Sequence, residues 1–204
     1  MATNLLSPTA RIRHEAILTA AARAFLEEGY GISIDRVAER AGVSKQTVYN
    51  HFGSKEDLFG EVVSLLIHDL TVPLDTAPED SDPETVLRQL ARQSLTMALE
   101  PEYLNGHRLM VAEAQRFPEF AAMAYEAGVA RVTRSLANYL ADQTARGRLA
   151  VKEAALAAEH FFGMVSGHIH LRALMGSGAI PTAEQLDRHV DLAVATFLRA
   201  YRPG

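Results

Sequence analysis

The chain has 204 residues and a formal net charge of −5. The excess of negative charge lies in residues 61–204, which carry 13 basic and 18 acidic side chains, whereas residues 1–60 carry seven of each. This balance argues against a generic nucleic-acid binder, so we expect any DNA binding to depend on a local patch of cations. Because the chain has no cysteine and no apolar run near the roughly 18 residues that span a bilayer, we expect a cytoplasmic protein without disulfides, thiolate metal sites or a membrane segment.

The first predicted helix covers residues 9–28. Apolar residues recur along it at helical spacing and form one face: Ile12, Ala16, Ile17, Ala20, Ala24 and Phe25. Gly29 follows, where glycine commonly ends a helix. The pattern indicates a helix that packs one side on a core.

Residues 33–52 predict two short helices around a glycine turn. Ser33 and Ser44 stand at the two helix starts, where a side-chain oxygen accepts from unpaired backbone N–H groups. Gly42 lies at the reversal, a position that favours a residue tolerant of positive φ. This pattern is typical of a helix-turn-helix, whose second helix enters the DNA major groove. The alternative is an ordinary corner of two helices with a polar outer face.

A family resemblance extends through this segment, in the motif Ala38-x-x-Ala41-Gly42-Val43-Ser44-x-x-x-Val48-Tyr49-x-His51-Phe52-x-Ser54-Lys55-Glu56-x-Leu58. Residues 10–60 resemble the N-terminal domain of the tetracycline-repressor (TetR) family. The resemblance implies that Lys45, Gln46 and Thr47 face the bases of a double-stranded DNA operator. It further implies phosphate contacts or other DNA contacts from Ser33, Ser44, Tyr49, His51 and Lys55.

Residues 54–70 predict a fourth helix, which begins with a variant of the capping box, Ser54-x-x-Asp57. We expect this helix to run from a DNA-binding domain at residues 1–54 into a ligand-binding and dimerisation domain at residues 55–204, and so to couple them. Residues 71–82, with two prolines and four acids, predict a loop.

Five further helices are predicted, over residues 83–99, 103–116, 117–146, 152–175 and 182–200. Nine helices and no strand pattern predict an all-α chain and match the architecture of the TetR family. Residues 108–120 resemble the AefR-like C-terminal domain found in one branch of that family. The resemblance implies a homodimer that binds a palindromic operator and responds to a small ligand.

Methionine and aromatic side chains of the second domain suit an apolar pocket for a small apolar effector. For any single one of them, however, we favour a place in the core. Glu113 lies among apolar neighbours at helical spacing. It either anchors a ligand or pairs with Arg88 or Arg92, and we favour the structural role. The candidate ligand-binding residues are Leu66, Leu90, Ser94, Met97, Met110, Glu113, Phe117, Tyr125, Phe162 and Val165.

The helix predicted over residues 152–175 is apolar on two faces, which indicates that both are buried. By resemblance, one of these faces and the helix over residues 182–200 form the dimer interface. The candidate residues are Phe161, Met164, His168, Leu171, Val190, Val194 and Phe197.

The sequence carries no catalytic or metal-binding motif. His168 and His170 point to opposite sides of one helix, and the sequence lacks a zinc-protease motif, a phosphate-binding glycine loop and a nucleophile elbow. We therefore predict a ligand-responsive transcriptional regulator, most simply a repressor, without cofactor, metal or enzymatic activity. The alternatives are an activator, and a helical enzyme or small-molecule-binding protein with an incidental helix-turn-helix.

Overall fold

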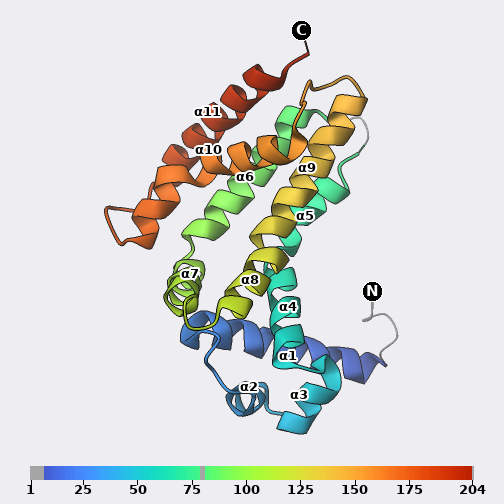
Figure 1. Ribbon diagram of the computed structural model, residues 1–204, viewed down its shortest axis with the longest axis vertical. Helices are drawn as coiled ribbons and strands as arrows, with labels where there is room; N and C mark the ends of the chain where they lie inside the picture. The colour runs from blue at the N-terminus through green and yellow to red at the C-terminus, as the bar shows by residue number, and fades with distance from the viewer. Residues whose placement is uncertain (1–6, 79–80, 204) are drawn as a thin grey trace. The chain divides into compact units, whose positions relative to one another are not determined.

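The computed structural model describes residues 7–78 and 81–203, and within those ranges it contains helices and no strand, which confirms the all-α class (Figure 1). The helices are α1 (Pro8–Glu28), α2 (Ile34–Ala41), α3 (Lys45–Phe52), α4 (Lys55–Leu66), α5 (His68–Asp75), α6 (Pro83–Leu99), α7 (Pro101–Glu113), α8 (Pro118–Ala127), α9 (Val129–Ala145), α10 (Ala154–Leu174) and α11 (Ala183–Tyr201).

Two of the nine predicted helices are each divided into two in the structure, so the described residues contain eleven helices. The fourth ends at Leu66, and α5 begins after Ile67. The predicted loop over residues 71–82 is wrong in its first part, because α5 continues to Asp75 despite Pro73. Leu70 and Leu74 are buried in the core, and that burial outweighs the one backbone hydrogen bond that a proline cannot make. Residues 79–80 of this loop lie outside the described residues.

The second division falls at Gly128, where the backbone has φ −101° and ψ −94° and separates α8 from α9. The predicted helix over residues 117–146 therefore consists of two helices. The chain passes between two compact units at Ile67, Asn105 and Gly128, so both divisions coincide with such a crossing.

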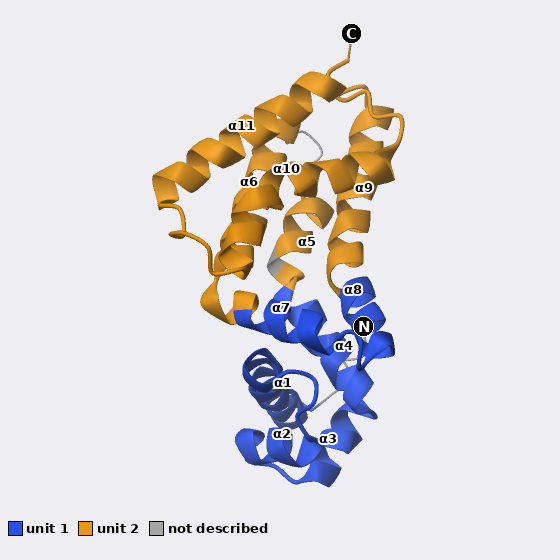
Figure 2. Cartoon of the chain, turned by 60° about the vertical axis from the view of Figure 1, so that its left-hand side comes forward, with its two compact units in different colours: residues 1–66, 105–127 blue, residues 67–104, 128–204 orange. Residues whose placement is uncertain are grey.

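Residues 1–66 and 105–127 form unit 1, and residues 67–104 and 128–204 form unit 2 (Figure 2). This division does not coincide with the expected domain boundary at residues 54 and 55, because all of α4, most of α7 and all of α8 belong to unit 1 with the N-terminal helices. The side-chain amide of Asn105 donates to the carbonyl oxygen of Leu26 at 2.9 Å. Helix α8 packs on α4.

An aromatic cluster joins α8 to the other helices of unit 1. The ring of Tyr30 stacks on that of Phe120 with centroids 3.9 Å apart. Phe59 of α4 meets Phe120 edge to face at 4.7 Å, and Phe25 of α1 meets Phe59 in the same way at 5.1 Å. Such pairs add to the stabilisation that burial of the rings provides. Unit 1 therefore has one core, shared by segments about 90 residues apart in sequence.

Unit 2 has its own core, formed by α5, α6, α9, α10 and α11. On its surface, Arg88 and Arg92 of α6 form ion pairs with Asp191 and Asp187 of α11. Helix α10 is kinked at Gly167, where φ is 27°, a value that favours glycine. Next to the kink, the Nε2 atom of His189 lies 2.9 Å from the carbonyl oxygen of Val165.

Candidate nucleic-acid interface

The helix-turn-helix of unit 1 is built as the sequence predicts. The Ser33 hydroxyl accepts from the N–H of Arg36 at 3.3 Å, and the Ser44 hydroxyl accepts from the N–H of Thr47 at 3.1 Å. Gly42, between α2 and α3, has φ 67° and ψ 31°, the left-handed conformation that glycine adopts at low cost. These caps fix where each helix begins and ends, and with it the direction of α3.

Helix α3 has an apolar inner face and a polar outer face. Val48 and Phe52 are buried in the core of unit 1. The outer face presents hydroxyl, amide, phenol and ammonium groups, from the exposed residues Ser44, Lys45, Gln46, Tyr49 and Asn50. These groups match those that bind phosphate oxygens and base edges in DNA complexes.

Each predicted base-reading side chain has a partner within unit 1. The ammonium Nζ of Lys45 lies 2.8 Å from Oδ2 of Asp35 on α2. The Gln46 side chain donates to Oδ1 of Asn50 at 2.9 Å. The half-buried Thr47 shares a hydroxyl hydrogen bond of 2.8 Å with Ser44. DNA contacts by these three residues therefore require exchange or sharing of an existing partner.

Lys55 and His51 are half-buried, like Thr47, whereas the remaining candidates are exposed. The Lys55 ammonium donates to the Tyr30 carbonyl oxygen and lies 4.1 Å from the centroid of the Tyr30 ring. Burial lowers the pKa of Lys55. Burial also lowers the pKa of His51, and so do its neighbours His14 and Arg13. A phosphate contact from Lys55 would require its ammonium either to leave Tyr30 or to use a donor that Tyr30 does not occupy.

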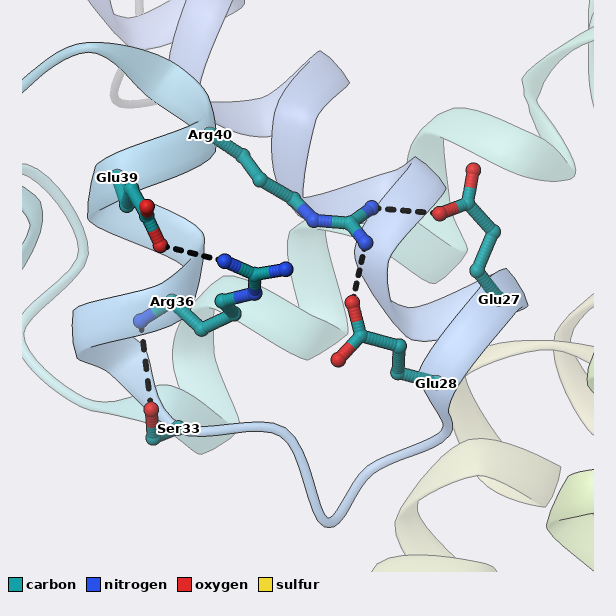
Figure 3. Close-up of polar contacts among 6 residues, drawn as sticks. All are labelled: Glu27, Glu28, Ser33, Arg36, Glu39 and Arg40. Carbon is teal, nitrogen blue, oxygen red and sulfur yellow. Dashed lines mark hydrogen bonds and ion pairs between the residues drawn. The ribbon is translucent and has the colours of Figure 1, made fainter.

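Two arginines of α2 are bound by carboxylates, as Figure 3 shows. Arg40 lies 2.6 Å from Glu27 and also pairs with Glu28, both at the end of α1. Arg36 pairs with Glu39 at 2.7 Å. The i, i+3 spacing of Arg36 and Glu39 on one helix predicts their ion pair from the sequence. The ion pairs of Arg40 and of Asp35 each join two different helices, so no spacing within one helix predicts them.

The predicted ligand-binding residues are divided between the two units. Unit 1 contains Leu66, Met110, Glu113, Phe117 and Tyr125, and unit 2 contains Leu90, Ser94, Met97, Phe162 and Val165.

Several of these residues have contacts of their own. Leu90 and Val165 are buried in the core of unit 2. The Ser94 hydroxyl donates to the Leu90 carbonyl oxygen at 2.8 Å. Tyr125 is exposed, and Phe117 packs against the core of unit 1.

Glu113 does not form the pair expected with Arg88 or Arg92, since those arginines bind Asp191 and Asp187. Its Oε2 atom lies 3.8 Å from Nη1 of Arg116. Among the described residues, that oxygen is buried without a hydrogen-bond partner.

The predicted dimer residues fall into two groups. Met164 is half-buried, and His168 and Leu171 are exposed. The others lie in the core of unit 2 within the single chain, so this fold leaves them no surface for a second copy: Phe161, Val190, Val194 and Phe197. The prediction could not separate the two groups because both apolar faces of α10 show the same helical periodicity. Periodicity does not indicate which of the two faces other helices of the same chain cover. Large apolar side chains that remain exposed on α10, on α11 and between them are Leu156, Leu171, Met175, Ile180 and Leu192.

Two features of the described residues bear on other functions. They contain no group of three metal-ligating side chains that could hold an ion. None of the described helices combines the length and apolar character needed to cross a bilayer.

A capped helix-turn-helix with a polar outer face, carried on an all-α chain, defines the class of helix-turn-helix transcriptional regulators. The chain belongs to the TetR family of these regulators. Residues 17–62 match the family described as bacterial regulatory proteins, tetR family, and residues 85–203 match the AefR-like transcriptional repressor, C-terminal domain.

Solved structures and curated proteins agree with this membership. A TetR-family regulator from Mesorhizobium loti is 34% identical, with a TM-score of 0.80, over 96% of this chain and 100% of that one. The flavonoid-responsive regulator FrrA is 30% identical, with a TM-score of 0.73, over 94% of this chain and 98% of that one. The HTH-type regulator YhgD of Bacillus subtilis (strain 168) is 31% identical over 63% of this chain. That match spans 65% of YhgD, which is less than two thirds of its length.

Proposed function

We propose that the protein is a ligand-responsive repressor that binds a near-palindromic operator as a homodimer. The observation that carries the proposal is the outer face of α3, which places a cation, amides and hydroxyls on a helix fixed by caps at both ends. Chromosomal DNA as the target implies a cytoplasmic location. An activator role would use the same DNA contacts and differ in where the operator lies.

Residues of α3 have separate tasks in this proposal. Lys45 and Gln46 read base edges, because lysine suits the acceptors of guanine and glutamine binds adenine through two hydrogen bonds. Thr47 adds a third contact to a base. Ser33, Ser44, Tyr49 and His51 bind phosphates and set the register of the helix on the duplex.

The exposed apolar surface of α10 and α11 supports the homodimer. Leu171 of α10 is 48% exposed and Leu192 of α11 is 60% exposed, and apolar side chains of this size left exposed on a surface suit contact with a second copy. A two-fold contact between copies would pair this surface with itself. The two recognition helices would then reach half-sites about 34–36 Å apart, or a small multiple of that distance.

The effector we propose is a small, mainly apolar molecule. A flavonoid is the first class to test, because FrrA is described as flavonoid-responsive and resembles this chain over nearly its whole length. The effector can act only if it binds the DNA-free conformer better than the DNA-bound one. A coupling of about 1–3 kcal/mol would lower operator affinity roughly 5- to 150-fold.

The decisive experiment selects DNA fragments with the purified protein and sequences them. We expect a motif with two-fold symmetry, and binding that a compound from a flavonoid panel weakens. Absence of any enriched motif would contradict the proposed function. A motif that responds to no compound would contradict only the effector class.

A further inference from the structure

The contact between Lys45 and Asp35 joins the two helices of the helix-turn-helix. Lys45 is the first residue of α3 and Asp35 is the second residue of α2. Their charged atoms lie 2.8 Å apart, and both side chains are more than half exposed. The hydrogen bond to Asp35 and the charge of Asp35 raise the pKa of Lys45. Since caps fix both helix starts, the fold itself brings these groups together.

The Lys45–Asp35 ion pair is one of several in which a carboxylate neutralises a cation of α2 or α3. Helices α2 and α3 are described in full and contain three Arg or Lys residues, Arg36, Arg40 and Lys45. Each of the three lies within ion-pair distance of a carboxylate. Lys45 differs from the other two because it belongs to the helix that we propose reads the bases. Its partner therefore affects recognition directly.

We propose that Asp35 is a specificity-determining residue, which suppresses sequence-independent DNA binding by occupying the ammonium of Lys45. This inference rests on the proposed function. Non-specific affinity comes from cations that neutralise phosphates and release counterions. An ammonium that already holds a carboxylate gains less from a phosphate, because it must give up Asp35 or bring that negative charge to the DNA.

An operator complex is affected less by the same pair. An ammonium has three N–H donors, so Lys45 can keep Asp35 and still donate to a base acceptor. Asp35 then holds the ammonium at the start of α3, where a base contact needs it. The pair thus lowers affinity for every duplex, and lowers it most for duplexes without the operator.

The test compares Asp35→Asn with wild type on the selected operator and on a duplex that lacks it, at low salt where surface charges act most strongly. We expect non-specific binding to tighten about two- to fivefold, the range that corresponds to an exposed ion pair. The slope of log affinity against log salt should steepen by up to about 0.9, as for one added phosphate contact. The ratio of operator to non-specific affinity should fall.

Two controls separate occupation of Lys45 from simple repulsion of DNA. Asp75→Asn makes the same change at an exposed residue of α5 and should leave both affinities unchanged. In a Lys45→Gln background, Asp35→Asn should lose most of its effect, because no ammonium remains to be released. An equal gain in both backgrounds, or an unchanged affinity ratio, overturns the proposal.

The outcomes also distinguish this proposal from the one on which it rests. A wild-type protein that selects no operator overturns both. A wild-type protein that selects one, while Asp35→Asn keeps the same affinity ratio, overturns only the role of Asp35. Thermal unfolding shows whether the variant is folded. If Asp35→Asn does not fold, Asp35→Ser supplies a second neutral, polar side chain in the first turn of α2, with the same expected result.

Discussion

The Nε2 atom of His14 on α1 lies 2.9 Å from Oε2 of Glu61 on α4. The His14 ring also stacks on Phe52, the last residue of α3, with centroids 4.4 Å apart. His14 is buried, and it precedes the residues that match the TetR N-terminal family. It therefore links three helices of unit 1 and fixes the C-terminal end of the proposed recognition helix.

We predict that His14→Ala destabilises the protein by about 1–3 kcal/mol, because a buried ring contact and a hydrogen bond are lost together. Denaturant unfolding measures this change. His14→Phe keeps a ring against Phe52 and should lose less. Operator affinity should fall for His14→Ala as α3 loses its support. Equal unfolding midpoints for wild type and His14→Ala would contradict this role.

Lys45→Ala should weaken operator binding by about 1–3 kcal/mol and relax the base preference at one position of each half-site. The reason is that a side chain at the start of α3 reads one base pair. Selection and sequencing with the variant reports both effects. Lys152→Ala, an exposed lysine of unit 2, is the control. A variant with the wild-type motif and affinity would remove Lys45 from the base-reading residues.

His51 makes stability depend on pH. Its pKa is lowered by burial and by His14 and Arg13. The unfolded chain therefore takes up this proton at a higher pH than the folded chain. Stability then falls as the pH drops through the ordinary value of about 6.5.

We expect His51→Gln to flatten the decline in the free energy of unfolding between about pH 7 and about pH 5. Urea titrations at several pH values measure the slope. His160→Gln, at an exposed histidine of α10, should keep the wild-type slope. If the His51→Gln variant also keeps the wild-type slope, His51 is not the group that makes stability depend on pH.

Leu192→Glu should convert a dimer into a monomer, because it places a charge on the exposed apolar surface of α11 that we propose faces a second copy. Sedimentation at micromolar concentration measures the mass, and operator affinity should fall with it. Val111→Glu alters an exposed apolar residue of unit 1 and should remain dimeric. A wild-type protein that sediments as a folded monomer would contradict the dimer itself.

Local signals were sufficient to predict the helix-turn-helix. The Ser33 and Ser44 caps and the Gly42 turn depend on residues within a few positions of one another, and all three are present. Contacts over long separations were not predictable in the same way. The division at Ile67 and the packing of α8 on α4 depend on burial that only the folded chain defines.

The candidate sites show the same limit. The motif gives Lys55 a phosphate contact, but Tyr30, 25 residues earlier, binds its ammonium. Phe161 and Leu171 are both apolar residues of α10, yet one lies in the core and the other is exposed. No pattern within one helix separates these two environments, because either a neighbouring helix or a second chain can cover an apolar face.

The discontinuity of unit 1 has a consequence for engineering hybrid regulators, in which the DNA-binding part of one family member is fused to the effector part of another. The family match ends at residue 62, and an exchange made there would separate the Tyr30 and Phe59 rings from Phe120, on which both pack. Residues 105–127 therefore need to be transplanted together with residues 1–66, as a graft of two segments, for the donor's DNA-binding part to keep its core.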